Sequence, residues 1–123
     1  MFQLEVTKRF YASHGLYDFR GEDELIHEHH WKVVVFAKAE TLDISGCAID
    51  FHEVDHLLNK VLSRFQGACF NDHAPFDVLS PSAENIAKYL HEELNLSLKS
   101  NLAAIFRVMV CEDEEHCASY ESH

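Results

Sequence analysis

The order of apolar and polar residues predicts strands in the first third of the chain. From residue 2 to residue 12 the apolar side chains mostly occupy alternate positions, and the run that begins at Trp31 alternates again. A period of two is typical of a strand with one buried face. We therefore expect strands over 2–12, ending near His14, and over 27–40, with a polar loop over 15–26 between them.

Two later segments carry the spacing of amphipathic helices. Apolar residues recur at intervals of three and four over 51–66, and again over 82–95, as one buried stripe on a helix requires. Asp50 precedes the first helix and is expected to cap it. Ser80 before Pro81, or Ser82 itself, can cap the second.

Two more strands are expected over 102–112 and 117–121. The element order then predicts an α+β fold, a four-stranded antiparallel sheet with two helices on one face. We find no repeat or linker, so residues 1–123 are expected to form a single domain.

The composition and charge of the chain argue against several classes of function. The formal net charge of −11 repels phosphate backbones, so we do not expect a nucleic-acid partner. No apolar run approaches the ~20 residues that span a bilayer, and the first residues lack the apolar core of a signal peptide. These features favour a cytoplasmic protein, in which the four cysteines are expected to be reduced thiols. The cysteines are Cys47, Cys69, Cys111 and Cys117.

Three histidines open the second expected strand. Side chains at i and i+2 of a strand point the same way, so His27 and His29 project together and His30 points to the other face. His14, at the end of the neighbouring strand, is the candidate third ligand of a zinc site that keeps a fourth position open. Spacing alone also permits solvated surface histidines or a patch that binds copper or nickel.

Six landmarks along the chain are similar to those of a known family. They are "FYASH" (10–14), "HEHHW" (27–31), "IDF" (49–51), "NDH" (71–73), "PSAEN" (81–85) and "VCE" (110–112). In order and spacing they resemble the 6-pyruvoyl-tetrahydropterin synthase and 6-carboxy-tetrahydropterin synthase family over nearly the whole chain.

This resemblance implies roles for particular residues. It implies three zinc ligands, namely His14, His27 and His29. Asp72 and His73 match a proton-handling pair, and Glu112 matches the carboxylate that holds the guanidine-like edge of the pterin. It also implies a homo-oligomer, a trimer whose sheets close into a barrel or a hexamer of two stacked trimers, with sites between subunits.

The chain departs from the best-known members of this family. They carry a cysteine shortly before the histidine pair, whereas residues 1–46 contain no cysteine. Glu24 lies three residues before His27, and this "ExxHxH" pattern resembles a cysteine-less subgroup in which a glutamate replaces the thiol. Glu28 stands where the family has glycine, and its parity predicts the face opposite His27. Cys69 is a further candidate to supply a thiol from the loop.

The resemblance, with these departures, implies a zinc-dependent lyase that acts on the side chain of a dihydropterin, with Glu24 as the base. The resemblance associates the cysteine-less subgroup with cleavage of 7,8-dihydroneopterin to 6-hydroxymethyl-dihydropterin, a folate precursor. The alternatives are a 6-carboxy-tetrahydropterin synthase, which makes a 7-deazaguanine precursor from the triphosphate, and a 6-pyruvoyl-tetrahydropterin synthase. Two non-catalytic readings also remain open, an inactive zinc- or pterin-binding homologue and a metal-storage module.

Overall fold

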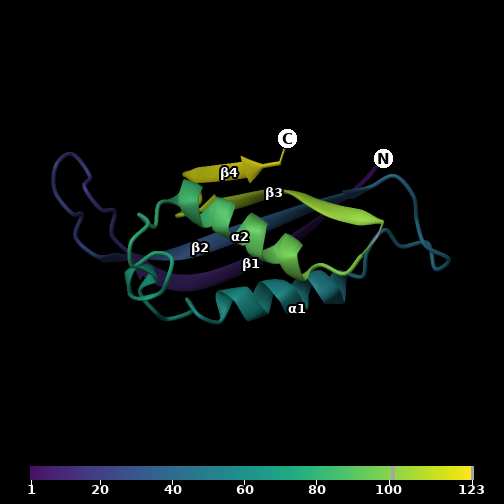
Figure 1. The fold of residues 1–123 in the computed structure, drawn as a ribbon, viewed down its shortest axis with the longest axis horizontal. Helices are drawn as coiled ribbons and strands as arrows, with labels where there is room; N and C mark the ends of the chain where they lie inside the picture. The colour runs from purple at the N-terminus through teal and green to yellow at the C-terminus, as the bar shows by residue number, and fades with distance from the viewer. Residues whose placement is uncertain (101, 123) are drawn as a thin grey trace.

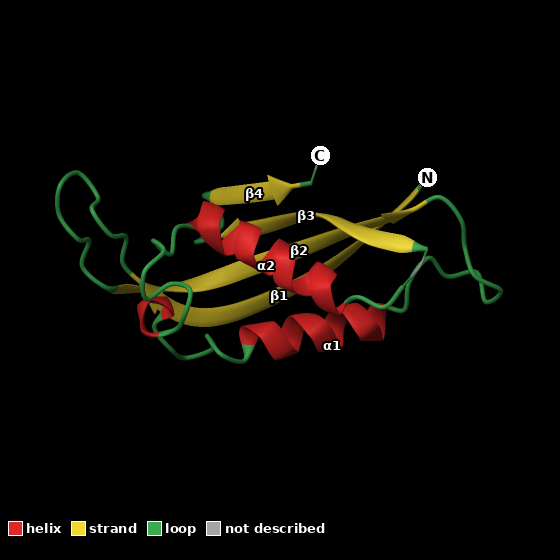
Figure 2. Cartoon of the chain, in the orientation of Figure 1, coloured by secondary structure: helices red, strands yellow, loops and turns green. Residues whose placement is uncertain are grey.

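Four strands, two helices and a short 3-10 turn make up the described part of the chain (Figure 1). The computed structural model describes residues 1–100 and 102–122. In chain order the elements are β1 (Phe2–His14), β2 (His27–Ala39), α1 (Phe51–Leu62), η1 (Phe70–Asp72), α2 (Ala83–Ser97), β3 (Ala103–Cys111) and β4 (Cys117–Glu121). The strands form one antiparallel sheet in the order β1-β2-β3-β4, and both helices cover the same face (Figure 2). The predicted α+β architecture is confirmed.

The register between β1 and β2 determines which side chains meet at one end of the sheet. His14 lies opposite His27, and His29 lies opposite Ala12. Trp31 is fully buried, and its indole N–H donates to the Ala12 carbonyl at 2.9 Å. Because residues of one parity share a face, the three histidines gather on the face that the helices cover.

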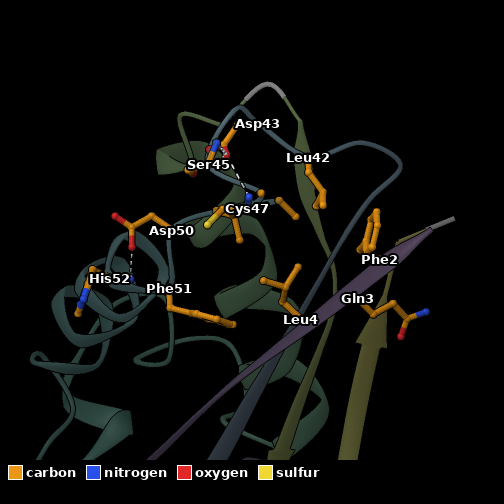
Figure 3. A pocket seen from close by; sticks show the side chains of 13 residues that line it. Phe2, Gln3, Leu4, Leu42, Asp43, Ser45, Cys47, Asp50, Phe51 and His52 are labelled. Atoms are coloured by element: carbon orange, nitrogen blue, oxygen red, sulfur yellow. Dashed lines mark hydrogen bonds between the residues drawn. The ribbon is translucent and has the colours of Figure 1, made fainter.

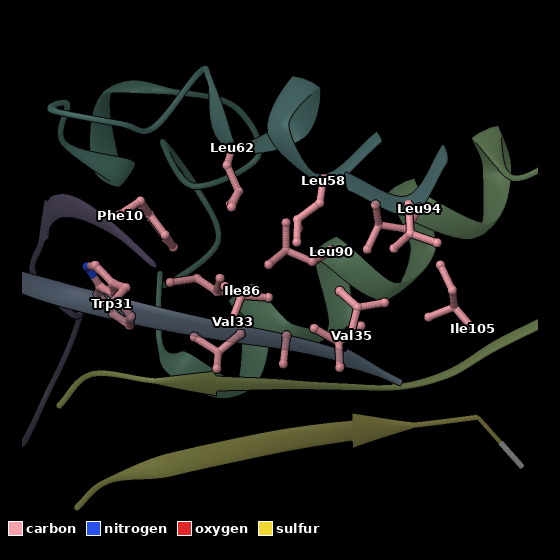
Figure 4. Packing of buried hydrophobic residues seen from close by; sticks show 14 of the residues in the cluster. Phe10, Trp31, Val33, Val35, Leu58, Leu62, Ile86, Leu90, Leu94 and Ile105 are labelled. Atoms are coloured by element: carbon pink, nitrogen blue, oxygen red, sulfur yellow. The ribbon is translucent and has the colours of Figure 1, made fainter. Parts of the chain in front are cut away.

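The core lies between this face and the two helices (Figure 4). Each helix contributes the apolar stripe that its sequence predicts, and β2 and β3 supply the opposite layer. Burying each large side chain stabilises the fold by about 1.5–3 kcal/mol. Central members of this core are Val33, Val35, Leu58, Leu62, Ile86, Leu90, Leu94 and Ile105.

Both helices begin with the expected type of cap. The Asp50 carboxylate accepts a hydrogen bond from the His52 amide at 2.9 Å. Ser82, one of the two alternatives considered for α2, accepts from the Asn85 amide at 3.1 Å. Within the described residues, neither helix has the length and apolarity that crossing a bilayer requires.

The first helix is shorter than the sequence predicts, since it ends at Leu62 rather than at residue 66. Phe65 instead enters the core and packs its ring on Phe70, with centroids 4.5 Å apart. Gly67 then adopts a φ of +72°, and its amide donates to the Tyr11 carbonyl at 2.7 Å. The chain therefore leaves the helix early because it turns to run beside β1.

The expectation of four reduced cysteines is wrong for one pair. Cys111 and Cys117 form a disulfide, whereas Cys47 and Cys69 are free. The antiparallel register places Cys111 directly opposite Cys117, at the last rung between β3 and β4. Two cysteines six residues apart do not by themselves indicate a disulfide. The hairpin between β3 and β4 brings the two sulfur atoms together.

Candidate metal centre

Three imidazoles converge where β1 ends and β2 begins. The centroids of the His14 and His27 rings are 4.8 Å apart, and that of His29 lies 5.1 Å from His14 and 4.7 Å from His27. One ring nitrogen from each residue lies within 4.8 Å of the other two. His30 stacks on Tyr11 with centroids 4.1 Å apart, on the other face of the sheet, as its parity predicts.

Backbone carbonyls orient two of the three rings. The Nδ1 atom of His14 lies 2.7 Å from the Pro81 carbonyl oxygen, and that of His27 lies 2.8 Å from the Leu25 carbonyl oxygen. A carbonyl oxygen accepts only, so we assign the proton of each ring to Nδ1. The lone pairs on Nε2 are then available, in the arrangement that metal-ligating histidines adopt.

In two of the three histidines the Nε2 atom has no hydrogen-bond partner. Within the described residues, the Nε2 atoms of His14 and His29 are buried and make no hydrogen bond. A buried polar group without a partner costs about 1–3 kcal/mol. A cation at the point where the three rings meet would satisfy both atoms, and three neutral imidazoles with an open fourth position suit zinc.

Burial keeps His14 in the form that can bind a metal. It lowers the pKa of the His14 imidazole, against the opposing effects of the Pro81 carbonyl and the Glu112 carboxylate. The ring is therefore neutral near pH 7. The two Glu112 oxygen atoms lie 3.8 Å from the Nε2 atoms of His14 and His29. Because the His14 ring is neutral, we interpret the carboxylate as negative charge beside a cation site and not as an ion-pair partner of His14.

The loop between β1 and β2 brings Glu24 to the same cluster. One carboxylate oxygen of Glu24 lies 3.9 Å from Nε2 of His27 and accepts the Leu16 amide at 3.2 Å. The Glu24 amide donates to the Leu16 carbonyl at 2.8 Å. Gly15 makes this approach possible, since a Cβ atom there would lie 2.6 Å from the Glu24 carbonyl oxygen. Glu28, by contrast, is exposed.

Hydrogen bonds from the preceding residue, Asn71, hold the Asp72–His73 segment near the end of β1. Neither Asp72 nor His73 bonds to the three histidines. Asn71 accepts from the Gly15 amide at 3.0 Å and donates to the Gly15 carbonyl at 2.8 Å. The His73 ring packs edge-on against Phe65. Among the described residues, no hydrogen bond or ion pair joins Asp72 or His73 to His14, His27 or His29.

Cys69, the other candidate to supply a thiol, lies in the same loop. Its Sγ is 3.6 Å from the side-chain oxygen of Asn71, to which the thiol donates. Its backbone forms a bridge with Ser13, the residue before His14. The thiol thus has a local partner, and the contacts with the histidine cluster come from Glu24 and Glu112.

An open groove of about 650 Å³ lies where β1 begins, lined by Phe2, Leu4, Phe51 and the loop around Asp43 (Figure 3). It is separated from His14 by most of the length of β1, roughly 40 Å at ~3.3 Å per residue. Among the described residues, His14, His27 and His29 are the one group with metal-binding geometry. The histidine cluster is therefore the candidate metal centre.

Sequence reasoning missed the groups that position these side chains. The carbonyls of Leu25 and Pro81 orient the rings, and Asn71 and Gly15 hold the loops together. The only available signal was that Asn71 and Pro81 belong to the "NDH" and "PSAEN" landmarks. Every residue has a backbone carbonyl, so the sequence does not indicate which carbonyl orients a side chain.

Comparison with solved structures identifies related folds. The 6-pyruvoyl tetrahydropterin synthase of Caenorhabditis elegans matches with a TM-score of 0.85 and 18% identity, over 99% of this chain and 96% of that one. A Plasmodium vivax 6-pyruvoyltetrahydropterin synthase in which a catalytic glutamate is replaced by alanine matches with a TM-score of 0.77 and 19% identity, over 99% and 98%. An uncharacterised Wolinella succinogenes protein matches with a TM-score of 0.72 and 14% identity, over 100% of both chains.

A search of curated protein sequences gave no match. The sequence model of the 6-pyruvoyl tetrahydropterin synthase family, however, matches residues 3–123. This match includes both strands that carry the histidines, the Glu24 loop and the hairpin with Glu112. At identities of 14–19% the structural matches establish the fold alone, whereas the family model covers nearly every residue. The chain therefore belongs to the 6-pyruvoyl tetrahydropterin synthase family.

Proposed function

We propose that this protein is a zinc-dependent lyase that acts on the side chain of a dihydropterin, either 7,8-dihydroneopterin or its triphosphate. The observation that carries the proposal is the convergence of three imidazole nitrogens within 4.8 Å, two of them buried without a partner. Zinc held by His14, His27 and His29 would supply Lewis acidity toward the side-chain hydroxyls of the substrate.

Glu24 is the base in this proposal. Its carboxylate lies beside His27, 3.9 Å from Nε2, where a side chain of a bound pterin would approach the cluster. The Leu16 amide donates to this same oxygen atom. The second oxygen atom of the carboxylate makes no hydrogen bond with the described residues and is available to accept a proton. A catalytic glutamate in the related Plasmodium vivax enzyme supports this assignment.

Glu112 would hold the pterin ring. A carboxylate can accept two parallel N–H donors at once, and the guanidine-like edge of a pterin presents such a pair. The Glu112 side chain is 32% exposed, so a ligand can reach it. Its position beside His14 and His29 would bring the side chain of the bound pterin to the histidine cluster.

Asp72 and His73 would complete the site from a neighbouring copy of the chain. Within one chain they do not contact the histidine cluster, and the proposed homo-oligomer places sites between subunits. His73, oriented by Asp72, would then carry protons as general acid and base. This arrangement makes turnover depend on assembly into the trimer or hexamer.

The reaction proposed for Glu24 as the base is a retro-aldol cleavage. Glu24 accepts the proton of the hydroxyl on the second side-chain carbon, and the bond between the first and second carbons breaks. The second carbon becomes an aldehyde, and the first carbon keeps the electron pair, which is delocalised into the pterin ring until it takes up a proton from His73. The products are 6-hydroxymethyl-dihydropterin and a two-carbon aldehyde.

Product analysis tests this proposal. Zinc-loaded protein is incubated separately with 7,8-dihydroneopterin and its triphosphate, and the products are separated by chromatography and identified by mass spectrometry. We expect 6-hydroxymethyl-dihydropterin from the unaltered protein, its loss in Glu24→Gln and its retention in Glu28→Gln, which changes an exposed glutamate. A 6-carboxy or 6-pyruvoyl product would refute the choice of base, and absence of any product with zinc bound would refute the lyase.

A further inference from the structure

The hairpin that carries Glu112 is closed by a covalent bond. Cys111 immediately precedes Glu112 and is joined to Cys117 across the last rung between β3 and β4. The Glu112 amide donates to the His116 carbonyl at 3.0 Å, directly above the disulfide. The residue before Glu112 is therefore covalently fixed, and this restrains the backbone from which the Glu112 side chain extends toward His14.

Apart from the disulfide, the contacts that fix the hairpin around Glu112 are exposed ones among the described residues. The Asp113 carboxylate accepts hydrogen bonds from the amides of Glu115 and His116 within the turn. Pairing between β2 and β3 ends at Lys32 and Cys111, so Glu112 lies beyond the last rung. Within one chain β4 has five residues and pairs with β3 alone, and the ends of strands open more readily than their centres. The ion pair between Arg9 and Glu114 spans 3.0 Å, but both side chains are exposed, and exposed pairs hold a loop only weakly.

We propose that the Cys111–Cys117 disulfide positions the Glu112 carboxylate beside His14 and His29, and that reduction of this bond by a dithiol weakens the metal centre. The inference rests on the proposed metal centre and adds to it a positioning role and a redox sensitivity. The free cysteines, Cys47 and Cys69, take no part in it.

The reduction step has a defined order. Cys117 is exposed, whereas Cys111 is fully buried, so a thiolate of the dithiol attacks the Cys117 sulfur and releases Cys111 as its thiolate. The second thiol of the reductant then displaces Cys117 and closes the disulfide of the reductant. Two electrons and two protons pass to the protein, which ends with two thiols.

Loss of the disulfide would change the position of the Glu112 carboxylate, which is the negative charge beside the proposed zinc site. Glu112 has one oxygen within 3.8 Å of Nε2 of His14 and the other within 3.8 Å of Nε2 of His29. Once the last rung of the hairpin opens, the carboxylate is free to move into water. We expect zinc affinity to fall roughly tenfold, the lower end of the effect of groups just outside the ligand shell.

A double-mutant cycle tests this inference through zinc affinity, measured by competition with a chromophoric chelator. The four proteins are the unaltered protein, the pair Cys111→Ala and Cys117→Ala, Glu112→Gln, and the triple variant. We expect the cysteine pair to lose about tenfold in affinity, but no further loss when Glu112→Gln is already present. Cys47→Ala, a free cysteine in the loop at the other end of the sheet, is the control and should bind zinc normally.

If removing the two cysteines lowers zinc affinity equally in the unaltered protein and in Glu112→Gln, the inference is overturned. The disulfide would then act on the fold as a whole. Unchanged affinity in the cysteine pair would overturn it as well. If the unaltered protein binds no zinc, the proposed metal centre fails, and hydrogen exchange at the Glu112 amide decides the positioning role. Faster exchange after treatment with a phosphine reductant would support that role, and unchanged exchange would overturn it.

Discussion

Gly15→Ala should displace the proposed base without removing any functional group. Gly15 follows His14 and packs against the loop that carries Glu24. A Cβ atom there would lie 2.6 Å from the Glu24 carbonyl oxygen and 2.9 Å from the end of the Ile26 side chain. The Ile26 side chain can rotate away, but the carbonyl is part of the backbone and can move only with the loop.

The structure gives the size of this displacement. Ordinary contact begins near 3.4 Å, so the carbonyl must retreat by about 0.8 Å. Misplacing a reacting group by ~1 Å can cost on the order of 100-fold in rate, and we expect kcat to fall by roughly 30- to 100-fold. Overpacking should also lower the free energy of unfolding by about 1–3 kcal/mol. Steady-state kinetics and urea unfolding measure the two effects.

Gly46→Ala is the matched control. Gly46 has a φ of +84° and nothing within 4 Å of an added Cβ atom, in the loop at the opposite end of the sheet. The left-handed backbone should cost about 1 kcal/mol in stability while kcat stays unchanged. Full activity in Gly15→Ala, or an equal loss of kcat in both variants, would refute the argument that close packing at Gly15 positions Glu24.

Three further predictions concern stability. Asp50→Ala removes the cap of α1 and should cost about 1 kcal/mol in urea unfolding, whereas Asp55→Ala, within the exposed face of α1, should cost far less. Asn71→Ala leaves the Gly15 amide and carbonyl without partners and should cost about 1–3 kcal/mol in the same assay. Burial lowers the pKa of His91, so zinc-free protein should lose stability as the pH falls below 6.5, and His91→Phe should lose less. An identical pH dependence of Tm in His91→Phe would contradict this reasoning.

The sequence was informative where local rules decide the structure. Alternation over 2–12 and 27–40 predicted both long strands, and β2 ends one residue earlier than expected, at Ala39. Asp50 was identified as a helix cap because a carboxylate before an apolar stripe has few other roles. The pairing of His27 with His29 followed from the period of a strand, and the rings do meet.

The sequence was uninformative where distant residues decide the structure. The end of α1 depends on Phe65 entering the core beside Phe70, which no local pattern reveals. The disulfide depends on a hairpin register that brings Cys111 opposite Cys117. In the same way, the Pro81 carbonyl orients His14 across 67 positions of sequence. Such contacts follow from the fold and could not be predicted before it.

Equilibrium zinc binding tests whether His14, His27 and His29 form a metal centre. Metal-free protein is titrated with zinc against a chelator of known affinity, and the same titration is repeated on His29→Ala and on His30→Ala, whose side chain lies on the other face of the sheet. The proposed metal centre predicts one zinc ion per chain, binding lost or weakened at least 100-fold in His29→Ala, and binding unchanged in His30→Ala. Equal binding in all three proteins, or no binding in the unaltered protein, would contradict it.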